Sequence, residues 1–341
     1  MIKGGRRLAI LVCGGAGYIG SHTVSELLER NEEVIVVDNL QTGHKEAILE
    51  GAAFYQGDLR DETFLHEVFT HNEIDAVIHF AADSLVGESV VEPLKYYDNN
   101  VNGVLVLLRV MKQHDVKKIV FSSTAATYGE AKNFPIQEND PTVPTNPYGE
   151  TKLAIEKMLK WSEAAYGIRY IVLRYFNVAG AHMEGKLGED HSPETHLIPI
   201  ILEVALGKRE SISIFGNDYD TEDGTCIRDY IHVTDLASAH LLAVDKLHRD
   251  EKSGTYNLGN GNGFSVKEVI DAARKVTGHA IPAVVVPRRA GDPARLVASA
   301  EKAKEELGWQ PKYPSLETII NSAWNWFQIN PNGYQKKVQN K

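Results

Sequence analysis

An apolar strand, a glycine-rich turn and a helix follow one another directly near the start of the chain. Residues 7–14, RLAILVCG, are almost continuously apolar, which is typical of a strand buried on both faces. Gly14, Gly17 and Gly20 follow at the spacing Gly-x-x-Gly-x-x-Gly, and the helical pattern of residues 18–31 starts among them. This order predicts the first half of a βαβ unit, whose turn and helix N-terminus can hold a pyrophosphate.

The alternation of apolar strand and helix continues to about residue 177. Further strands are predicted at residues 33–40, 52–59, 74–82, 117–124 and 168–177. Further helices are predicted at residues 60–72, at residues 93–115 and from residue 147 onward. Continuous apolar strands joined by helices indicate a parallel sheet that is covered on both faces. The predicted fold class is therefore α/β, with a Rossmann-type doubly wound parallel sheet.

A second unit is expected after residue 177, where the regular alternation ends. Glycine, proline and charged residues dominate residues 178–196, and the elements predicted after them are short. A chain of 341 residues is long enough for two closely packed domains. We predict a sheet domain at residues 1–177, with return segments around residues 229–258. A smaller mixed α/β domain at residues 178–341 is predicted to bind the substrate.

Composition and charge argue against several other classes of protein. The net charge is −10, from 36 Lys and Arg against 46 Asp and Glu, without a long basic tract, so nucleic acid is not an expected partner. The first apolar run, residues 8–13, is too short for a secretion signal, and no apolar stretch is long enough to cross a bilayer. Because Cys13 and Cys226 lack the spacing of metal ligands, we predict a reducing, cytoplasmic location.

An acidic residue at the end of the second strand indicates which dinucleotide the glycine turn prefers. Asp38 comes 18 residues after Gly20, where a carboxylate binds ribose hydroxyls and repels a 2′-phosphate. This favours NAD over NADP; the alternative is a structural turn and a surface aspartate. Asp58, just past the third strand, is expected either to hold the adenine amino group or to cap the next helix.

A tyrosine and a lysine four residues apart occur twice, as Tyr148 with Lys152 and as Tyr128 with Lys132. The first pair follows Pro147, which favours a helix start, so its two side chains share one helical face. The second pair precedes the segment NFP, where a regular helix is disfavoured. We therefore interpret the second pair as a chance match.

The face that carries Lys152 continues through Ile155 and Leu159, and is thus predicted to point inward. Lowering the pKa of a phenol from about 10 to near 7 takes about 4 kcal/mol, and one positive charge about 4 Å away supplies energy of that order. Lys152, helped by an oxidised nicotinamide, is predicted to provide that charge. Tyr148 then acts as a general base for a hydroxyl group while hydride leaves the same carbon, and Thr124, after the fifth strand, holds the oxygen.

The glycine turn, Asp38, Thr124 and Tyr148-x-x-x-Lys152 resemble the extended short-chain dehydrogenase/reductase family. Longer words, in unbroken order from about residue 8 to 335, are similar to the UDP-sugar 4-epimerases of that family. They are GGAGYIGSH, DNLQTGH, VIHFAA, VGESV, YYDNNV, RYFNVAGA, EDGTCIRDYIHV and RRAGD.

The resemblance implies that NAD is held tightly and used catalytically. Tyr148 would deprotonate the sugar 4-hydroxyl while C4 gives hydride to NAD, and the hydride would return to the other face of the 4-keto sugar. UDP-galactose and UDP-glucose would thereby be interconverted. Besides Gly14, Gly17, Gly20, Asp38, Asp58, Thr124, Tyr148 and Lys152, the NAD site would contain Tyr18, Ile19, Asn39, Leu59, Phe80, Ala81, Ala82, Asn99 and Phe176.

The resemblance also gives the second domain a purpose, because UDP would bind there. Besides Thr124 and Tyr148, the substrate site would contain Asn177, Leu197, Phe215, Arg228, Arg289 and Asp292. A homodimer would form through residues 93–111 and 152–161.

The chain departs from the pattern of the relatives at Thr124, at Asp83 and Ser84, and at Leu296. Thr124 replaces a common serine and keeps the hydroxyl group. Asp83 and Ser84 replace a segment that often carries a lysine near the cofactor, which puts one phosphate contact in doubt. Leu296 falls at a gate position, where relatives strict for unmodified hexoses have tyrosine and those accepting N-acetyl sugars have smaller residues. Epimerisation of UDP-N-acetylhexosamines therefore stays open as an alternative.

Two further alternatives are weaker. A sugar-nucleotide 4,6-dehydratase carries an acidic pair after the strand-five hydroxyl, whereas this chain has Ala125 and Ala126. A non-enzymatic NAD-sensing regulator tends to lose the tyrosine or the lysine, and both are present. No metal is expected, because His191 and His196 lie in a loop without cysteines or a supporting carboxylate pattern; His196 is expected to line the uridine site.

Overall fold

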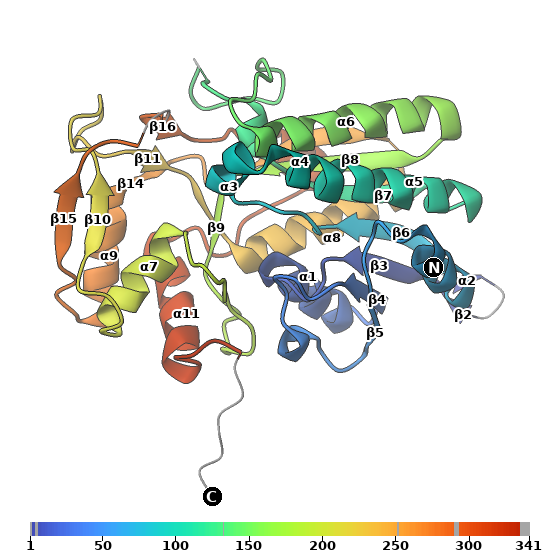
Figure 1. The fold of residues 1–341 in the computed structure, drawn as a ribbon, viewed down its shortest axis with the longest axis horizontal. Helices are drawn as coiled ribbons and strands as arrows, with labels where there is room; N and C mark the ends of the chain where they lie inside the picture. The colour runs from blue at the N-terminus through green and yellow to red at the C-terminus, as the bar shows by residue number, and fades with distance from the viewer. Residues whose placement is uncertain (1, 4–5, 132, 251, 290–292, 335–341) are drawn as a thin grey trace, which may run out of the picture.

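The computed structural model describes residues 2–3, 6–131, 133–250, 252–289 and 293–334. The larger of its two lobes is built on a seven-stranded sheet in which all neighbouring strands are parallel (Figure 1). In spatial order the strands are β13 (Gly254–Leu258), β8 (Arg169–Tyr175), β7 (Lys118–Thr124), β6 (Ile74–His79), β3 (Ala9–Cys13), β4 (Glu33–Asp38) and β5 (Ala52–Gln56). The α/β fold class with a doubly wound parallel sheet is thus confirmed.

Strand β3 shows why its sequence is apolar throughout. Ile10 and Val12 belong to the core on one face of the sheet, and Ala9 and Leu11 to the core on the other face. All four are at most 4% exposed. Successive side chains of a strand point to opposite faces, so a strand between two helical layers must be apolar at every position.

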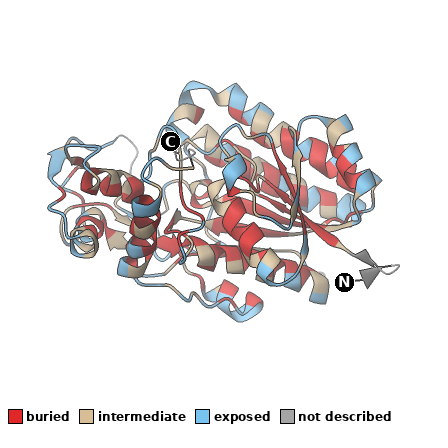
Figure 2. Cartoon of the chain, turned by 90° about the horizontal axis from the view of Figure 1, so that it is seen from below, coloured by how far each residue is buried: buried red, intermediate tan, exposed pale blue. Residues whose placement is uncertain are grey.

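Helices cover both faces of this sheet, and their inner sides are buried while their outer sides are exposed (Figure 2). One core includes residues of α1 (Tyr18–Glu29), α8 (Val233–Arg249) and α10 (Glu301–Leu307). The other core includes residues of α2 (Glu62–His71), α5 (Gly103–Gln113) and α6 (Pro147–Tyr166).

The helix predicted at residues 93–115 is less regular than expected. It consists of α4 (Pro93–Tyr96), the π-helical segment η2 (Tyr97–Asn102) and α5, and it follows the short helix α3 (Val86–Val91). Within η2, the buried side chain of Asn100 accepts from the Asp83 backbone N–H at 2.8 Å and donates to the Asp83 carbonyl at 3.0 Å. These two bonds fix the loop after β6 against the helix, at a place where π-helical turns often mark functional sites.

Within the described part of the chain, the smaller lobe contains three short sheets. The strands β9 (Asn177–Ala179) and β12 (Tyr230–His232) are parallel, as are β10 (Ile212–Phe215) and β15 (Ala283–Val286). The third sheet has the order β14 (Phe264–Ser265), β11 (Ile227–Arg228) and β16 (Arg295–Leu296). A separate core includes residues of α7 (Leu197–Ala205), α9 (Val266–Thr277) and α11 (Leu316–Ile329).

The chain passes between the lobes more than once. After β12 it returns to the larger lobe through α8 and β13, which pairs with β8. The remaining elements are β1 (Ile2–Lys3), β2 (Arg6–Arg7), η1 (Lys45–Ala47) and η3 (Ala125–Thr127). Among the helices of the described residues, none combines the length and the apolar character that a membrane crossing requires.

Candidate active site

A cavity of about 1110 Å³ opens at the carboxyl ends of the sheet strands. Its walls include residues at the ends of β3, β4, β6, β7 and β8 or just after them, together with the start of α6 and the segment 189–196. Strands β3 and β6 are neighbours in the sheet. The strands that follow β3 extend the sheet toward one edge, and those that follow β6 extend it toward the other. Ligands bind at such a switch point. All the residues predicted to bind a dinucleotide line this cavity, and the walls draw on both lobes.

The glycine turn contains two glycines that the fold requires and one that it does not. A Cβ atom at Gly14, whose φ is +81°, would lie 2.6 Å from the Ala81 nitrogen, and one at Gly20 would lie 2.1 Å from the Gly14 oxygen. At Gly17 a Cβ would only make an ordinary contact of 3.4 Å with the Gly14 oxygen. Gly17 lines the cavity, so close approach of a ligand to its backbone explains this glycine better than packing does.

Asp38 is held at the cavity edge beside this turn. Its Oδ2 accepts from the Ala16 backbone N–H at 3.0 Å, and its Oδ1 accepts from the Leu40 N–H at 2.8 Å. Burial raises the pKa of the Asp38 carboxyl, and these backbone bonds oppose the rise. The carboxylate therefore has a fixed position next to the first strand, as binding of ribose hydroxyls requires.

Asp58 lines the cavity but does not cap the helix that follows it. Its Oδ2 accepts from Asn39 Nδ2 at 3.2 Å, and its Oδ1 accepts from Arg60 Nε at 2.9 Å. These bonds to Arg60 hold the Asp58 pKa well below its usual range. The N-cap of α2 is Asp61, whose side chain accepts from the Phe64 N–H at 3.0 Å. The capping alternative for Asp58 was therefore wrong.

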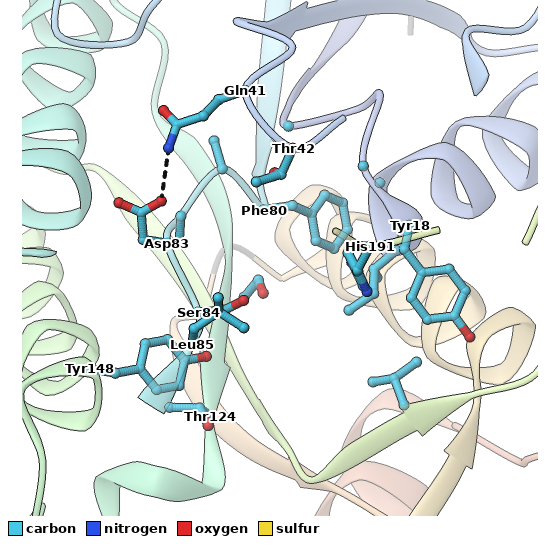
Figure 3. Close-up of a pocket in the computed structure, with 18 of the residues that line it drawn as sticks. Tyr18, Gln41, Thr42, Phe80, Asp83, Ser84, Leu85, Thr124, Tyr148 and His191 are labelled. Carbon is cyan, nitrogen blue, oxygen red and sulfur yellow. Dashed lines mark hydrogen bonds between the residues drawn. The ribbon is translucent and has the colours of Figure 1, made fainter. Parts of the chain in front are cut away.

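Tyr148 is positioned by the N-terminus of α6. Asn146 caps this helix, with its Oδ1 accepting from the Gly149 N–H at 2.9 Å, and Pro147 occupies the first turn. A Cβ atom at Gly149 would lie 2.6 Å from the Ala126 oxygen, so the glycine lets α6 pack closely against the end of β7. Thr124, the last residue of β7, thereby lies beside Tyr148 in the cavity (Figure 3).

Lys152 lies one turn further along α6 and is only 2% exposed. Its Nζ donates to the Ser122 carbonyl at 2.8 Å and lies 5.9 Å from the centre of the Tyr148 ring. Burial lowers the pKa of Lys152 to about 7, although Glu156 opposes this change. Ile155 is also buried, which confirms that this helical face points inward.

The pKa of Tyr148 differs from the expectation. Burial raises the Tyr148 pKa to about 12, and a hydrogen bond from the Thr124 hydroxyl lowers it only in part. The desolvation of the phenol thus outweighs the effect of the Thr124 hydroxyl, and the neighbouring Lys152 directs its Nζ to the Ser122 carbonyl. Without a bound cofactor, the surroundings of Tyr148 therefore favour its protonated form at neutral pH.

A buried polar network lies under this part of the site. Arg174, on β8, donates to the Glu156 carboxylate through two nitrogens and to the Tyr128 hydroxyl at 2.9 Å. Ser123 donates to Glu156 at 2.6 Å, and Tyr128 donates to Asn257 Oδ1 at 2.7 Å. Tyr128 therefore has a structural environment, in line with the interpretation that its pair is a chance match; Lys132 lies outside the described residues.

The residues predicted to bind the uridine diphosphate are brought together only in part. Asn177, His196 and Arg289 line the cavity, whereas Leu197, Phe215, Arg228 and Leu296 do not, and Asp292 lies outside the described residues. Phe215 nevertheless lies directly behind the cavity wall. The guanidinium of Arg289, a wall residue, lies 3.9 Å from the centre of its ring. Arg228 and Leu296 are paired on β11 and β16.

Sequence reasoning missed several cavity residues. Ser122 and Tyr175, whose hydroxyls are hydrogen-bonded to each other, lie near the carboxyl ends of β7 and β8, where the rule that identified Thr124 also applied. Most of residues 83–90 line the cavity as well, and Gln41 Nε2 reaches Asp83 Oδ1 at 3.3 Å (Figure 3). No local pattern in the sequence signals that contact.

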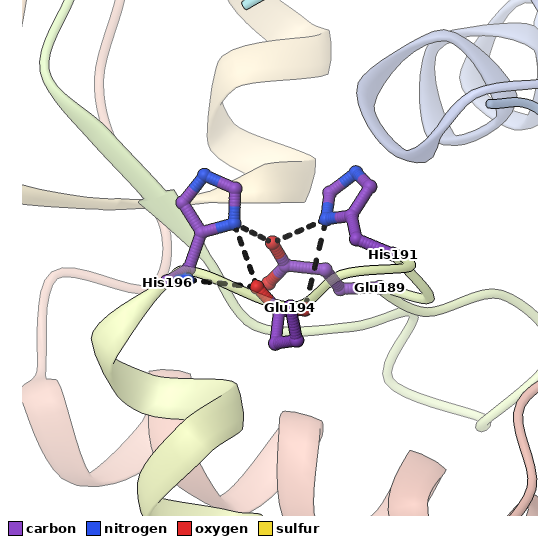
Figure 4. A group of neighbouring side chains, drawn as sticks. All are labelled: Glu189, His191, Glu194 and His196. Atoms are coloured by element: carbon purple, nitrogen blue, oxygen red, sulfur yellow. Dashed lines mark hydrogen bonds and ion pairs between the residues drawn. The ribbon is translucent and has the colours of Figure 1, made fainter. Parts of the chain in front are cut away.

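A second cluster on the cavity wall was also missed. Glu189 and Glu194 lie against His191 and His196 (Figure 4). The prediction that no carboxylates support these two histidines was therefore wrong. Burial would lower the pKa of each histidine, but the two carboxylates raise the pKa of His191 to about 9 and that of His196 to about 10. Burial conversely disfavours the Glu194 carboxylate, yet the histidines lower its pKa to about 2.

Known proteins resemble this chain over nearly its whole length. The UDP-glucose 4-epimerase of Halalkalibacterium halodurans is 65% identical over 334 residues, which cover 98% of this chain and 100% of that protein. A crystal structure of a UDP-glucose 4-epimerase has 64% sequence identity and a TM-score of 0.95, and the match covers 96% of this chain and 100% of that one. The UDP-glucose 4-epimerase from Bifidobacterium longum in complex with NAD⁺ and UDP has 46% identity and a TM-score of 0.90, over 95% and 99% of the two chains.

The family model that matches covers most of the chain. It describes the NAD dependent epimerase/dehydratase family and matches residues 10–259. This range includes the glycine turn, Asp38, Thr124, Tyr148 and Lys152, which the structure places around one cavity. The protein belongs to the NAD dependent epimerase/dehydratase family.

Proposed function

We propose that the protein interconverts UDP-galactose and UDP-glucose by reversible oxidation at C4 of the sugar, with NAD as a retained cofactor. The observation that carries this proposal is the convergence of Gly17, Asp38 and Tyr148 on one cavity whose walls come from both lobes. A dinucleotide and a base for a sugar hydroxyl thereby share one site. The relatives of highest identity reported above have this activity in their names, which supports the same chemistry here.

NAD fits the side of the cavity that the larger lobe forms. The Gly17 backbone and the N-terminus of α1, which no side chain of the described residues caps, would face the pyrophosphate. Asp38 would bind the adenosine ribose, and the loop after β6, Phe80–Ala82, would lie along the cofactor, with Asn99 and Phe176 on the same wall. When bound, NAD supplies the hydride acceptor and donor for C4.

Tyr148 is the group that we propose takes and returns the proton of the sugar 4-hydroxyl. Its phenolic oxygen would remove this proton as C4 is oxidised, and would return it to the alcohol of opposite configuration. Thr124, which already donates a hydrogen bond to the phenol, would also hold the reacting sugar oxygen. A general base of this kind contributes about 10²–10⁴ to the rate.

The electrostatics of Tyr148 and Lys152 suggest when this base is active. Burial raises the Tyr148 pKa to about 12 and lowers that of Lys152 to about 7, so the pair on its own does not hold a stable phenolate. A further positive charge beside the phenol, as on an oxidised nicotinamide ring, lowers the Tyr148 pKa and raises the cost of keeping its proton. Tyr148 would thus become basic only next to the oxidised cofactor.

The second lobe is proposed to hold the uridine diphosphate. Arg289 lines the cavity together with Asn177 and His196. Arg289 and Arg228, which lies outside the cavity wall, are forked donors suited to a diphosphate. We accordingly assign NAD binding to residues 1–177, with return segments around residues 229–258, and UDP-sugar binding to residues 178–341. A cytoplasmic location is inferred from the presence of only two cysteines, Cys13 and Cys226, which are both buried and not joined in a disulfide.

We also propose that two copies of the chain associate through α3, α4 and α6. Val91, Leu94 and Trp161 are between 74% and 80% exposed, and they lie on these three helices. Exposed large apolar side chains that gather on neighbouring elements commonly mark an interface. Light scattering is expected to give twice the chain mass of 37.8 kDa, whereas Leu94→Glu with Trp161→Glu should give the mass of a single chain. A wild-type mass of one chain at all concentrations would contradict this assignment.

The reaction itself is tested by adding UDP-galactose to the purified protein without added NAD and following UDP-glucose by chromatography. Conversion is expected, because the cofactor is proposed to stay bound. UDP-N-acetylgalactosamine in a parallel reaction tests whether leucine at position 296 admits an acetamido group. Absence of UDP-glucose, with and without added NAD, would reject the proposed substrate.

A further inference from the structure

Two glutamates and two histidines meet within eight residues of the chain, between β9 and α7. We propose that Glu189, His191, Glu194 and His196 bind one divalent transition-metal ion, with Zn²⁺ as the ion that suits them best (Figure 4). The site is separate from the proposed hydride and proton chemistry, although its residues form part of the cavity wall.

The distances within the cluster match those between the ligands of a tetrahedral ion. The four candidate ligand atoms all lie within 4.8 Å of one another. His196 Nδ1 is 2.9 Å from Glu189 Oε1 and 3.0 Å from Glu194 Oε1, and His191 Nδ1 is 3.2 Å from Glu189 Oε1. Zinc bonds of about 2.0–2.2 Å at tetrahedral angles place neighbouring ligand atoms roughly 3.3–3.5 Å apart, so a small outward movement would admit the ion.

The side chains converge on a shared point rather than forming two separate pairs. Both imidazoles approach the same Oε1 atom of Glu189, and both do so through Nδ1. His191 Nδ1 is buried and, among the described residues, has no hydrogen-bond partner, although two carboxylates lie within 3.7 Å of it. Ligand atoms that are directed at a common ion lie close to one another without forming hydrogen bonds, as His191 Nδ1 and these carboxylates do.

Burial of its two carboxylates makes the cluster unlike a chance gathering of surface charges. The Glu189 and Glu194 side chains are 5% and 7% exposed, whereas those of His191 and His196 are 30% and 47% exposed. Carboxylates buried to this degree need positive charge beside them. Without an ion the two imidazoles, when protonated, supply this charge; a divalent ion would replace both protons, place two charges at one point and likewise leave the cluster neutral.

The ligand set selects among metals. Imidazole nitrogen favours zinc and its neighbours in the transition series, whereas Mg²⁺ and Ca²⁺ prefer oxygen ligands alone. Because four protein ligands complete a tetrahedral shell, the site resembles structural rather than catalytic zinc. The ion would fix residues 189–196 on the cavity wall, and it would use only one nitrogen of His196, leaving Nε2 to face a ligand.

Metal binding can be measured without any reaction, so failure of this inference and failure of the proposed function are distinguishable. The full-length protein is treated with a chelator, dialysed, and titrated with Zn²⁺ against a chromophoric competitor. We expect about one Zn²⁺ per chain, and a melting temperature higher by roughly 3–5 °C at a hundredfold excess of free Zn²⁺ over the dissociation constant. Mg²⁺ at the same concentration should give no such shift.

Variants locate the site. His191→Ala and Glu194→Gln are each expected to weaken Zn²⁺ binding at least 100-fold and to remove the shift in melting temperature. The matched control is His66→Ala, because His66 Nδ1 and His114 Nε2 form another close imidazole pair, 2.9 Å apart, and neither residue lines the cavity. This control should keep full Zn²⁺ affinity.

Two results would overturn the inference. One is a wild-type protein that, once folded and freed of chelator, takes up less than a stoichiometric amount of Zn²⁺ at micromolar concentration. The other is a folded Glu194→Gln or His191→Ala protein that binds Zn²⁺ as tightly as the wild type, which would place the ion elsewhere.

Discussion

Tyr148→Phe is expected to lower kcat for UDP-galactose by about 10³, within the range of about 10²–10⁴ for loss of a general acid–base group. The phenol lies beside Thr124 at the end of β7 and faces the cavity that the glycine turn also lines. Removing its oxygen leaves the ring and the packing of α6 in place. KM should therefore change far less than kcat, which initial rates over a range of UDP-galactose concentrations will show.

Tyr166→Phe is the matched control for this substitution. Tyr166 is the last residue of the same helix and is 46% exposed, so its hydroxyl can be removed without touching the cavity. Its kcat should stay within about twofold of the wild-type value. Wild-type activity in Tyr148→Phe would mean that another group takes the proton, even if the overall reaction is the one proposed.

Arg174→Met is expected to lower the free energy of unfolding by about 3–5 kcal/mol. Arg174 and Glu156 are 6% and 8% exposed, and methionine would leave the Glu156 carboxylate buried without its cation. Among the described residues, only the hydroxyl of Ser123 would still donate to that carboxylate. Urea unfolding followed by circular dichroism, at matched cofactor content, gives the difference.

An exposed ion pair provides the comparison. Arg30 Nη1 lies 2.8 Å from Asp245 Oδ2, and the two side chains are 41% and 50% exposed. Arg30→Met should cost at most about 1 kcal/mol, because water screens such pairs. If Arg30→Met and Arg174→Met lowered the free energy of unfolding equally, burial would not be what makes the Arg174 pair stabilising.

The fold of the larger lobe was predictable because the same pattern of apolar strand and helix recurs along the chain. Most of the strands from β3 to β8 are apolar runs separated along the chain by helices, so these elements support the same parallel sheet. Gly14, Asp38 and Thr124 all follow from one rule, that ligands meet the carboxyl ends of such strands. Their shared cavity needed no information from distant parts of the chain.

The parts that sequence reasoning missed depend on contacts between distant segments. Asn100 bonds the Asp83 backbone across 17 residues, and this contact accompanies the π-helical turn in a helix that was predicted to be regular. The Tyr148 pKa depends on the desolvation of the phenol, which the spacing from Lys152 does not reveal. The glutamates beside His191 were visible in the sequence, but the loop that brings them together has no repeating period.

The position of hydrogen at C4 tests the central claim most directly. UDP-galactose carrying deuterium at C4 is incubated in ordinary water with the purified protein, and the UDP-glucose formed is examined by proton NMR. Reversible oxidation in a closed site predicts that deuterium stays on C4 of the product, because hydride that returns to the same carbon never exchanges with water. UDP-glucose with ordinary hydrogen at C4 would contradict the account, since it would require the atom to leave as a proton.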